Sequence, residues 1–158
     1  MLIQNAIKIT ENHPEEFFLV SAHRHDYVSY TFKNGNTVSA DGGAAYVRRA
    51  TSGTSNKEYG QTWMEWCVDD REPLYAIKEK LLWGTYGKSG KEPFKYVLLK
   101  KCETDHLQKI LEQENIGELY KTVILSILKD RLPKFNRKKV FATVDKSNIR
   151  MSKNKKKK

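Results

Sequence analysis

The hydrophobic pattern of the first fifty residues is the short alternation that is typical of β-strands. Aromatic and β-branched side chains gather in runs, most clearly at Tyr27, Val28 and Tyr30. Asn34-Gly35 interrupts the pattern and favours a type I′ hairpin, because both of its central positions need a positive φ. We therefore predict strands over residues 3–9, 16–21, 25–32 and 37–40, a turn at residues 41–43, and a strand or a short helix over residues 44–49.

The middle of the chain alternates breaks with short apolar runs. Residues 51–60 are small, polar and glycine-bearing, which predicts a flexible loop and the best boundary within the body. Pro73 suits the first turn of a helix. The remaining predictions here are a strand over residues 61–68, a helix over residues 74–82, a glycine-spaced loop over residues 83–90 and a strand over residues 94–99.

Two helices are predicted to close the body. Thr104 is a good N-cap for the first, which carries an apolar stripe from Leu107 to Leu111. The second has apolar positions with 3.6-residue periodicity from Leu119 to Leu128 and ends before Pro133. The predicted fold class is α+β: a small antiparallel sheet with hairpins, covered by this pair of amphipathic helices and followed by a disordered basic tail.

This pattern divides the chain into three parts. Residues 1–50 are predicted to form a β-rich, ribbon-like module. Residues 61–132 are predicted to form an α+β module that ends in the helix pair, with a single domain over both modules as the alternative. Residues 133–158 are predicted to be a disordered, Lys-rich tail.

Positive charge is concentrated at the C-terminal end. Residues 131–158 hold twelve of the 29 Lys and Arg residues and one of the 19 acidic residues, Asp145. The preceding residues therefore keep 17 basic and 18 acidic side chains, and the net charge of +10 divides into +11 on the tail and −1 on the body. A neutral body with a basic arm is typical of a folded module joined to a peptide that binds polyanions.

Several classes of protein are disfavoured by composition. Two cysteines, Cys67 and Cys102, are too few for a disulfide framework and fit a reducing cytosol. Together with His106 and a further histidine they match no zinc-site spacing, so we expect no metal and no other cofactor. The N-terminus is too short and polar for a signal peptide, and no apolar run approaches the length of a membrane span. We expect a cytoplasmic protein without a membrane partner.

Reactive side chains are dense between residues 23 and 49. One interpretation is a functional site, in which a histidine pair acts as acid and base, carboxylates orient it, and arginines hold a phosphate. His23 and His25 would then share one face of a strand. The other interpretation is a hairpin whose polar residues satisfy the backbone, with Asp-Gly-Gly as turn chemistry. The candidate cluster comprises His23, His25, Asp26, Asp41, Arg48 and Arg49.

The same string resembles an uncharacterised module of tailed-phage and some bacterial proteins. That module has Asn-Ala-Ile, His-Asp-Phe/Tyr-Val and Asp-Gly-Gly-x-x-Tyr-x-Arg-Arg, which correspond here to residues 5–7, 25–28 and 41–49. Many members carry cysteine pairs that suggest a zinc ribbon, whereas this chain has no cysteine before Cys67. The resemblance covers residues 3–49 and implies a ribbon-like module held by hydrophobic packing without a metal. It also implies a phage accessory protein, which would act in the cytoplasm of the host cell.

A second stretch resembles a segment of phage accessory proteins. It comprises residues 83–88, Pro93, Tyr96 and residues 104–107, and in those proteins too an amphipathic helix follows. Aromatic residues around it, interleaved with lysines, would either stack on bases or complete the core of a small sheet. These are Trp63, Trp66, Trp83, Tyr86 and Tyr96, with Lys88, Lys91 and Lys95.

Three functions remain open at this point. The first is a non-enzymatic phage accessory protein, active in host takeover or anti-defence, that binds nucleic acid without sequence specificity through its tail. The second is an inhibitor or modulator that binds a host protein through the neutral body. The third is a small metal-free nuclease built on the His/Asp/Arg cluster. The first assigns nucleic-acid binding to Arg137, Lys138, Lys139, Lys146, Arg150, Lys153, Lys155, Lys156, Lys157 and Lys158.

Overall fold

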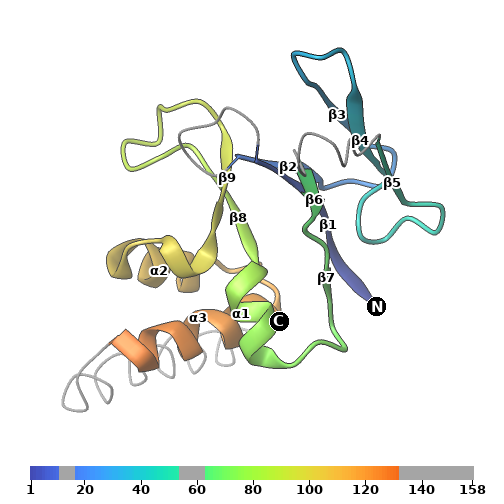
Figure 1. The fold of residues 1–158 in the computed structure, drawn as a ribbon. Coiled ribbons are helices and arrows are strands. Elements are labelled where there is room, and N and C mark those ends of the chain that lie inside the picture. Colours follow the sequence, from blue (N-terminus) through green and yellow to red (C-terminus); the bar gives the residue numbers. More distant parts are fainter. Residues whose placement is uncertain (11–16, 54–62, 132–158) are drawn as a thin grey trace, which may run out of the picture. The chain divides into compact units, whose positions relative to one another are not determined.

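Antiparallel strands precede a pair of helices, which confirms the α+β class (Figure 1). The computed structural model describes residues 1–10, 17–53 and 63–131. The chain divides into two compact units, Met1–Leu99 and Lys100–Lys158. The predicted tail, residues 133–158, lies outside the described residues, as does most of the loop predicted over 51–60.

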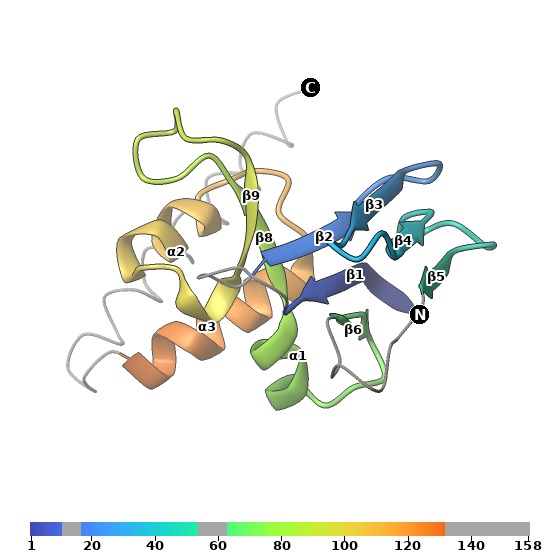
Figure 2. The same ribbon diagram turned by 45° about the horizontal axis from the view of Figure 1, so that its top comes forward.

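The central sheet of the first unit is built around its N-terminal strand. β1 (Leu2–Ile9) pairs antiparallel with β2 (Phe17–Ser21) along one edge. Along its other edge it pairs with β6 (Trp63–Glu65) and β7 (Val68–Asp69). Figure 2 shows β1 between β2 and β6. Strands from both sides of residues 54–62 therefore share one sheet.

A second sheet contains the predicted hairpin. β3 (Tyr27–Thr31) pairs with β4 (Thr37–Asp41), and β4 pairs with β5 (Ala50–Gly53). Gly35 has the expected positive φ, of 85°, but the predicted type I′ turn centred on Asn34-Gly35 is wrong. The Gly35 amide donates to the Phe32 carbonyl at 2.9 Å, so Lys33 and Asn34 are the central residues of the turn and Gly35 follows them. The prediction of a strand or helix over residues 44–49 is wrong. These residues form successive turns, because the Tyr46 amide donates to the Gly43 carbonyl and the Arg49 amide to the Tyr46 carbonyl.

A short helix and a third pair of strands complete this unit. α1 (Leu74–Lys80) begins after Pro73 as predicted, and β8 (Leu82–Thr85) pairs with β9 (Lys95–Leu98). The helix was predicted to reach Leu82, but Leu81 is already extended with a ψ of 128°. The Leu82 amide donates instead to the buried Oε1 of Gln4 at 2.9 Å. The loop predicted over residues 83–90 is therefore partly a strand.

Two hydrophobic clusters contribute to the core of the first unit. The first joins the central sheet to the β3–β4 hairpin and comprises Ile7, Ile9, Phe32, Val38 and Ala40. The second joins the central sheet to the β8–β9 hairpin and comprises Ala6, Phe18, Leu82 and Leu98, with Val20, Trp66 and Tyr96 packed against it. Alternate residues of β1 thus serve different clusters, because successive side chains of a strand point to opposite faces.

The second unit contains the predicted helix pair. α2 (Thr104–Leu111) and α3 (Glu118–Arg131) pack against each other, and a 3₁₀ turn, η2 (Leu99–Lys101), precedes them. Thr104 was predicted as the N-cap of α2, but the cap is Glu103, without a side-chain capping bond. Arg131 closes the pair by donating to the carbonyls of Cys102 and Lys100. The predicted apolar face is buried at Leu107, Ile110, Val123, Ile124, Ile127 and Leu128.

Candidate functional site

The two candidate histidines lie in a loop and not on a strand. Residues 22–26 connect β2 to β3, and both His23 and His25 are exposed there. This corrects the expectation that they share one strand face. Asp26 holds the loop, because its Oδ2 accepts bonds from the amides of Ala22 and His23 at 3.1 and 2.8 Å. The carboxylate predicted to orient a histidine therefore satisfies the backbone.

The Asp-Gly-Gly turn packs directly on this loop. Gly42 has a φ of 72° and donates its amide to the Asp26 carbonyl, while Gly43 donates to the His23 carbonyl at 2.7 Å. A Cβ on Gly43 would lie 2.7 Å from the His23 carbonyl carbon, so glycine permits the close approach of the two backbones. Asn5 of β1 donates Nδ2 to the Gly42 carbonyl at 2.8 Å and ties the turn to the central sheet.

Tyr46 packs on the Asp-Gly-Gly turn and contacts two side chains of the preceding loop, Arg24 and His25. Its ring covers Gly42, where a Cβ would meet the ring at 2.1 Å. The His25 ring meets Tyr46 edge-on at 5.2 Å, and the Arg24 guanidinium lies over its face at 5.9 Å. Arg24, His25 and Tyr46 thus pack around a glycine turn through aromatic and cation–π contacts.

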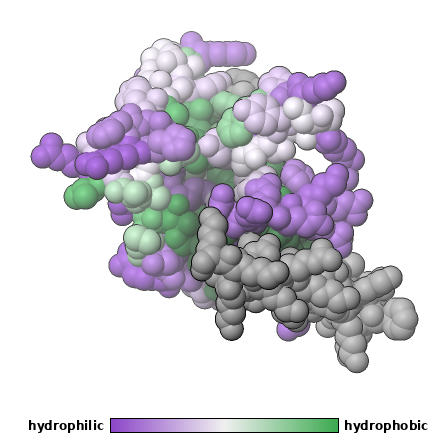
Figure 3. Space-filling model, turned by 180° about the vertical axis from the view of Figure 1, so that it is seen from behind, coloured by the Kyte–Doolittle hydropathy of each residue, from purple (hydrophilic) through white to green (hydrophobic). Residues whose placement is uncertain are grey.

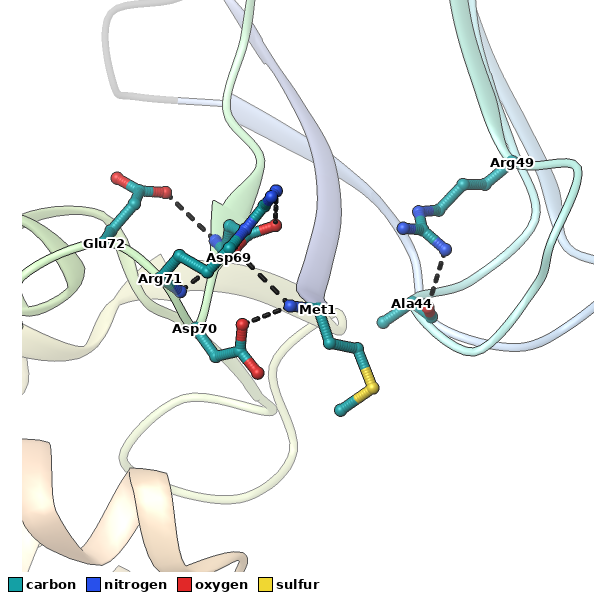
Figure 4. Close-up of polar contacts among 7 residues, drawn as sticks. All are labelled: Met1, Ala44, Arg49, Asp69, Asp70, Arg71 and Glu72. Atoms are coloured by element: carbon teal, nitrogen blue, oxygen red, sulfur yellow. Dashed lines mark hydrogen bonds and ion pairs between the residues drawn. The ribbon is translucent and has the colours of Figure 1, made fainter.

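The two candidate arginines have different roles. Arg49 donates Nη1 to the carbonyls of Ala44 and Tyr46 at 3.2 and 3.0 Å, the first of which is drawn in Figure 4. Arg48 is exposed, as is Asp41 at the end of β4. Asp26 and Arg49 therefore hold turns, whereas His23, His25, Asp41 and Arg48 lie at the surface.

An aromatic ladder lies on one face of the β8–β9 hairpin. The ring centroids of Tyr86 and Phe94 are 5.1 Å apart, and those of Phe94 and Tyr96 are also 5.1 Å apart. Gly84 stands opposite Tyr96 in the register, and a Cβ there would lie 2.6 Å from Phe94 Cζ. Phe94 therefore occupies the space that a side chain at Gly84 would fill.

The ladder runs from the core to the surface. Tyr96 packs on the second hydrophobic cluster, and burial, with a smaller contribution from the charge of Asp26, raises the pKa of its phenol. Phe94 and Tyr86 are 50 % and 57 % exposed. Phe94 was not among the aromatic residues singled out from the sequence. The contacts of Phe94 depend on the pairing of β8 with β9. Because residues 83–90 were predicted to be a loop, this pairing was not predicted.

Trp66 and Trp63, which were also candidates for base stacking, pack against other side chains of the fold. Trp66 donates Nε1 to the Lys80 carbonyl at 2.9 Å and packs on Phe18 with centroids 5.5 Å apart. The Lys8 ammonium lies 4.9 Å from the Trp66 centroid. Trp63 packs against the first hydrophobic cluster. These contacts favour the alternative to base stacking, in which both tryptophans complete the core of a small sheet.

A network of charged groups joins β1 to the segment after β7 (Figure 4). Arg71 binds both carboxylate oxygens of Asp69, at 2.7 and 2.9 Å, and this holds the pKa of Asp69 well below its ordinary value. The N-terminal ammonium pairs with Asp70 and lies 3.5 Å from Asp69. Lys80 pairs with Glu72 at 2.6 Å and lowers the pKa of that carboxyl.

Three further findings bear on the predicted functions. Within residues 1–10, 17–53 and 63–131, no group of three or more His, Cys, Asp and Glu side chains is arranged to hold a metal ion. Over the same residues, no helix combines the length and the apolarity that a membrane crossing needs. The ten basic residues assigned to nucleic-acid binding all lie in the tail, outside the described residues.

Comparison of the chain with protein-family models, with curated proteins and with solved structures finds no match.

Proposed function

We propose that this protein is a non-enzymatic accessory protein that binds nucleic acid through its basic C-terminal tail. The observation that carries the proposal is the division of charge. Residues 131–158 hold twelve basic side chains against the single acid Asp145, whereas the rest of the chain is close to neutral. A polyanion is the partner that such a segment attracts most strongly, because each phosphate contact releases a condensed counterion.

The residue types of the tail indicate how it would bind. Lysine dominates from Lys153 onward, and lysine is a compact charge without the planar fork with which arginine recognises guanine. Contacts of this kind position a protein on the phosphate backbone and carry no sequence information. The proposed binding is therefore independent of sequence and strongly dependent on salt.

The folded residues favour a binding protein over a nuclease. Asp26 Oδ2 is engaged by two amides and Arg49 Nη1 by two carbonyls, which supports a structural role for both side chains. The resemblance to tailed-phage modules supports an accessory role in host takeover or anti-defence, exerted in the cytoplasm of the infected cell. Binding of a host protein through the neutral body is the competing proposal.

The test is a salt titration on the full chain with duplex and single-stranded oligonucleotides of arbitrary sequence. Log K should fall linearly with log salt, at about −0.9 per phosphate engaged on duplex and about −0.7 on single strands. Affinity should drop by orders of magnitude between about 50 and 200 mM salt. Replacement of Lys153 and Lys155 to Lys158 by Gln should flatten this slope by up to about 4 on duplex.

Two matched variants control this experiment. Replacement of the same lysines by Arg keeps the charge and should keep the slope, whereas Arg48→Gln removes an exposed charge of the body and should change it little. The proposal fails if the full chain shows no salt-dependent binding at low salt, or if the Gln variant binds as tightly as the unmodified protein. In either case binding of a host protein through the body becomes the leading proposal.

A further inference from the structure

We infer that the aromatic ladder of the β8–β9 hairpin, Tyr86, Phe94 and Tyr96, stacks on unpaired bases, so that the protein prefers single-stranded nucleic acid. This inference rests on the proposed function for its ligand class and adds a second site on the folded body. Base stacking on aromatic side chains is tolerant of sequence, because every base offers a π face. It therefore suits a protein whose charged contacts are also independent of sequence.

The first step of the argument is that the rings are exposed and yet held in place. Tyr86 and Phe94 keep 57 % and 50 % of their surface exposed, whereas Tyr96 anchors the inner end of the ladder in the core. Neighbouring centroids are 5.1 Å apart along the whole ladder, with tilted and edge-to-face geometries. A ring that is already ordered loses little conformational entropy when a base stacks on it.

The second step is that the connecting loop is closed by its own bonds. The Glu92 amide donates to the Tyr86 carbonyl at 2.9 Å, and the Gly87 amide donates to Thr85 Oγ1 at 3.1 Å. Gly87 has a φ of 74°, and a Cβ there would lie 2.0 Å from the Glu92 carboxyl carbon. The backbone on either side of Tyr86 and Phe94 is therefore fixed by a glycine that no larger residue could replace without rearrangement.

The third step is the charge around the loop. Lys88 and Lys91 are exposed beside the ladder. The single acid of the loop, Glu92, is exposed too and accepts a bond from the Lys88 amide at 3.2 Å, so Lys88 and Lys91 leave the loop with a net positive charge. A cationic rim beside exposed rings matches a strand that presents bases together with phosphates. A protein that bound the aromatic ladder would not need lysines next to the rings, whereas a nucleic acid strand would use them to contact its phosphates.

Figure 3 shows one face of the molecule, which is largely hydrophilic with hydrophobic residues visible between the polar ones. Other large hydrophobic side chains are exposed too, including Tyr27, Val47 and Tyr75, at 64, 92 and 72 %. No ring contact joins these three to one another among the described residues, whereas Tyr86 and Phe94 contact each other. This difference makes Tyr75 a matched control for the ladder.

The experiment compares three probes on the full chain: an oligothymidylate, the same length of abasic deoxyribose-phosphate chain, and a duplex. The oligothymidylate should bind about tenfold or more tightly than the abasic chain, because only it offers bases. Tyr86→Leu and Phe94→Leu should each remove about tenfold of that preference without changing the salt slope. Tyr75→Leu should leave it unchanged, and circular dichroism establishes that each variant is folded.

The outcomes separate this inference from the proposed function. If the abasic chain binds as tightly as the oligothymidylate, or if the Leu variants bind like the unmodified protein, the ladder does not stack on bases and the inference is overturned. A salt slope that depends on the tail would still support the proposed function. If base preference depends on the rings while the tail contributes no salt slope, the proposed function fails and the inference stands. If the Leu variants only convert a dimer to a monomer, the ladder binds a second copy and the inference is wrong.

Discussion

At the residue scale, individual side chains of the N-terminal motif form hydrogen bonds with the backbone and hold its turns. Asp26 caps the loop that contains both candidate histidines, and Arg49 holds the turns that lead to β5. Gly42 carries a positive φ beneath the ring of Tyr46. Of the six candidate residues, Asp26 and Arg49 thus hold turns, while His23, His25, Asp41 and Arg48 lie at the surface.

The Gly42 position offers a sharp test of this interpretation. Gly42→Ala should destabilise the protein by about 1–3 kcal/mol, because alanine is strained at positive φ and its Cβ would collide with the Tyr46 ring. Gly35→Ala is the matched control, since Gly35 has a similar φ but no atom within 4 Å of an added Cβ. Urea unfolding measures both. Equal losses would mean that the packing of Tyr46 on the turn contributes nothing.

The charged network around Asp69 predicts a dependence on pH. The pKa values of Asp69 and Glu72 are lowered in the folded protein, by bonds with Arg71 and Lys80 respectively. Their stabilisation is therefore complete above the unfolded pKa of about 4 and is lost as the pH falls below it. The free energy of unfolding should be level through neutral pH for these groups and should decline below about pH 4.

Asp69→Asn isolates this contribution. The difference in unfolding free energy between the unmodified protein and this variant should be constant from about pH 8 to 5 and should shrink towards pH 3. Both partners are accessible to water, so the difference should be small at high salt. A difference that grows as the pH falls would contradict the sign of the predicted effect.

At the element scale, the helices and strands with the strongest local sequence patterns are the ones predicted correctly. The hairpin around Asn34-Gly35 and the helix over Glu118–Arg131 carry strong patterns, and both are confirmed. The helix over residues 74–82 ends earlier than predicted because the Leu82 amide binds the Gln4 side chain, a partner 78 residues away. No pattern near Leu82 could have indicated that bond.

The helix pair should depend on the apolar face of α3. Ile124→Ala should cost about 2–5 kcal/mol, since Ile124 is fully buried and its loss leaves a cavity. Lys129→Ala on the exposed side of the same helix should stay within about 0.5 kcal/mol. Thermal unfolding followed by circular dichroism compares the two. Similar melting temperatures would show that this face contributes little to stability.

At the scale of the whole molecule, folding and proposed binding are assigned to different parts of the chain. The apolar periodicity of the last helix stops before Pro133, whereas the excess of positive charge lies in residues 131–158. A protein arranged in this way can lose its tail without losing its fold.

We therefore expect truncation after Lys134 to leave the melting temperature nearly unchanged. Truncation after Ile127 is the contrasting variant, because it removes the buried Leu128 and the Arg131 bonds to Cys102 and Lys100, and it should lower the melting temperature clearly. If truncation after Lys134 alone removes several kcal/mol, then an apolar residue such as Phe135, Val140, Phe141 or Ile149 contributes to the core.

The sequence by itself determined what depends on local patterns and on composition. Strand and helix periodicity, the Asn-Gly hairpin signal and the division of charge are all properties of neighbouring residues, so they could be derived without coordinates. The α+β class follows from the order of those patterns. The burial of Leu107, Ile110, Val123, Ile124, Ile127 and Leu128 follows in the same way.

Only the tertiary structure decided which distant residues meet. The pairing of β1 with β6 and β7 and the bond from the Leu82 amide to the Gln4 side chain join segments whose contact has no local signature. The same holds for Phe94, which becomes part of an exposed ladder through the register of β8 and β9. Cross-strand register is set by packing and turn geometry over the whole hairpin, so side-chain chemistry across it could not be predicted from spacing alone.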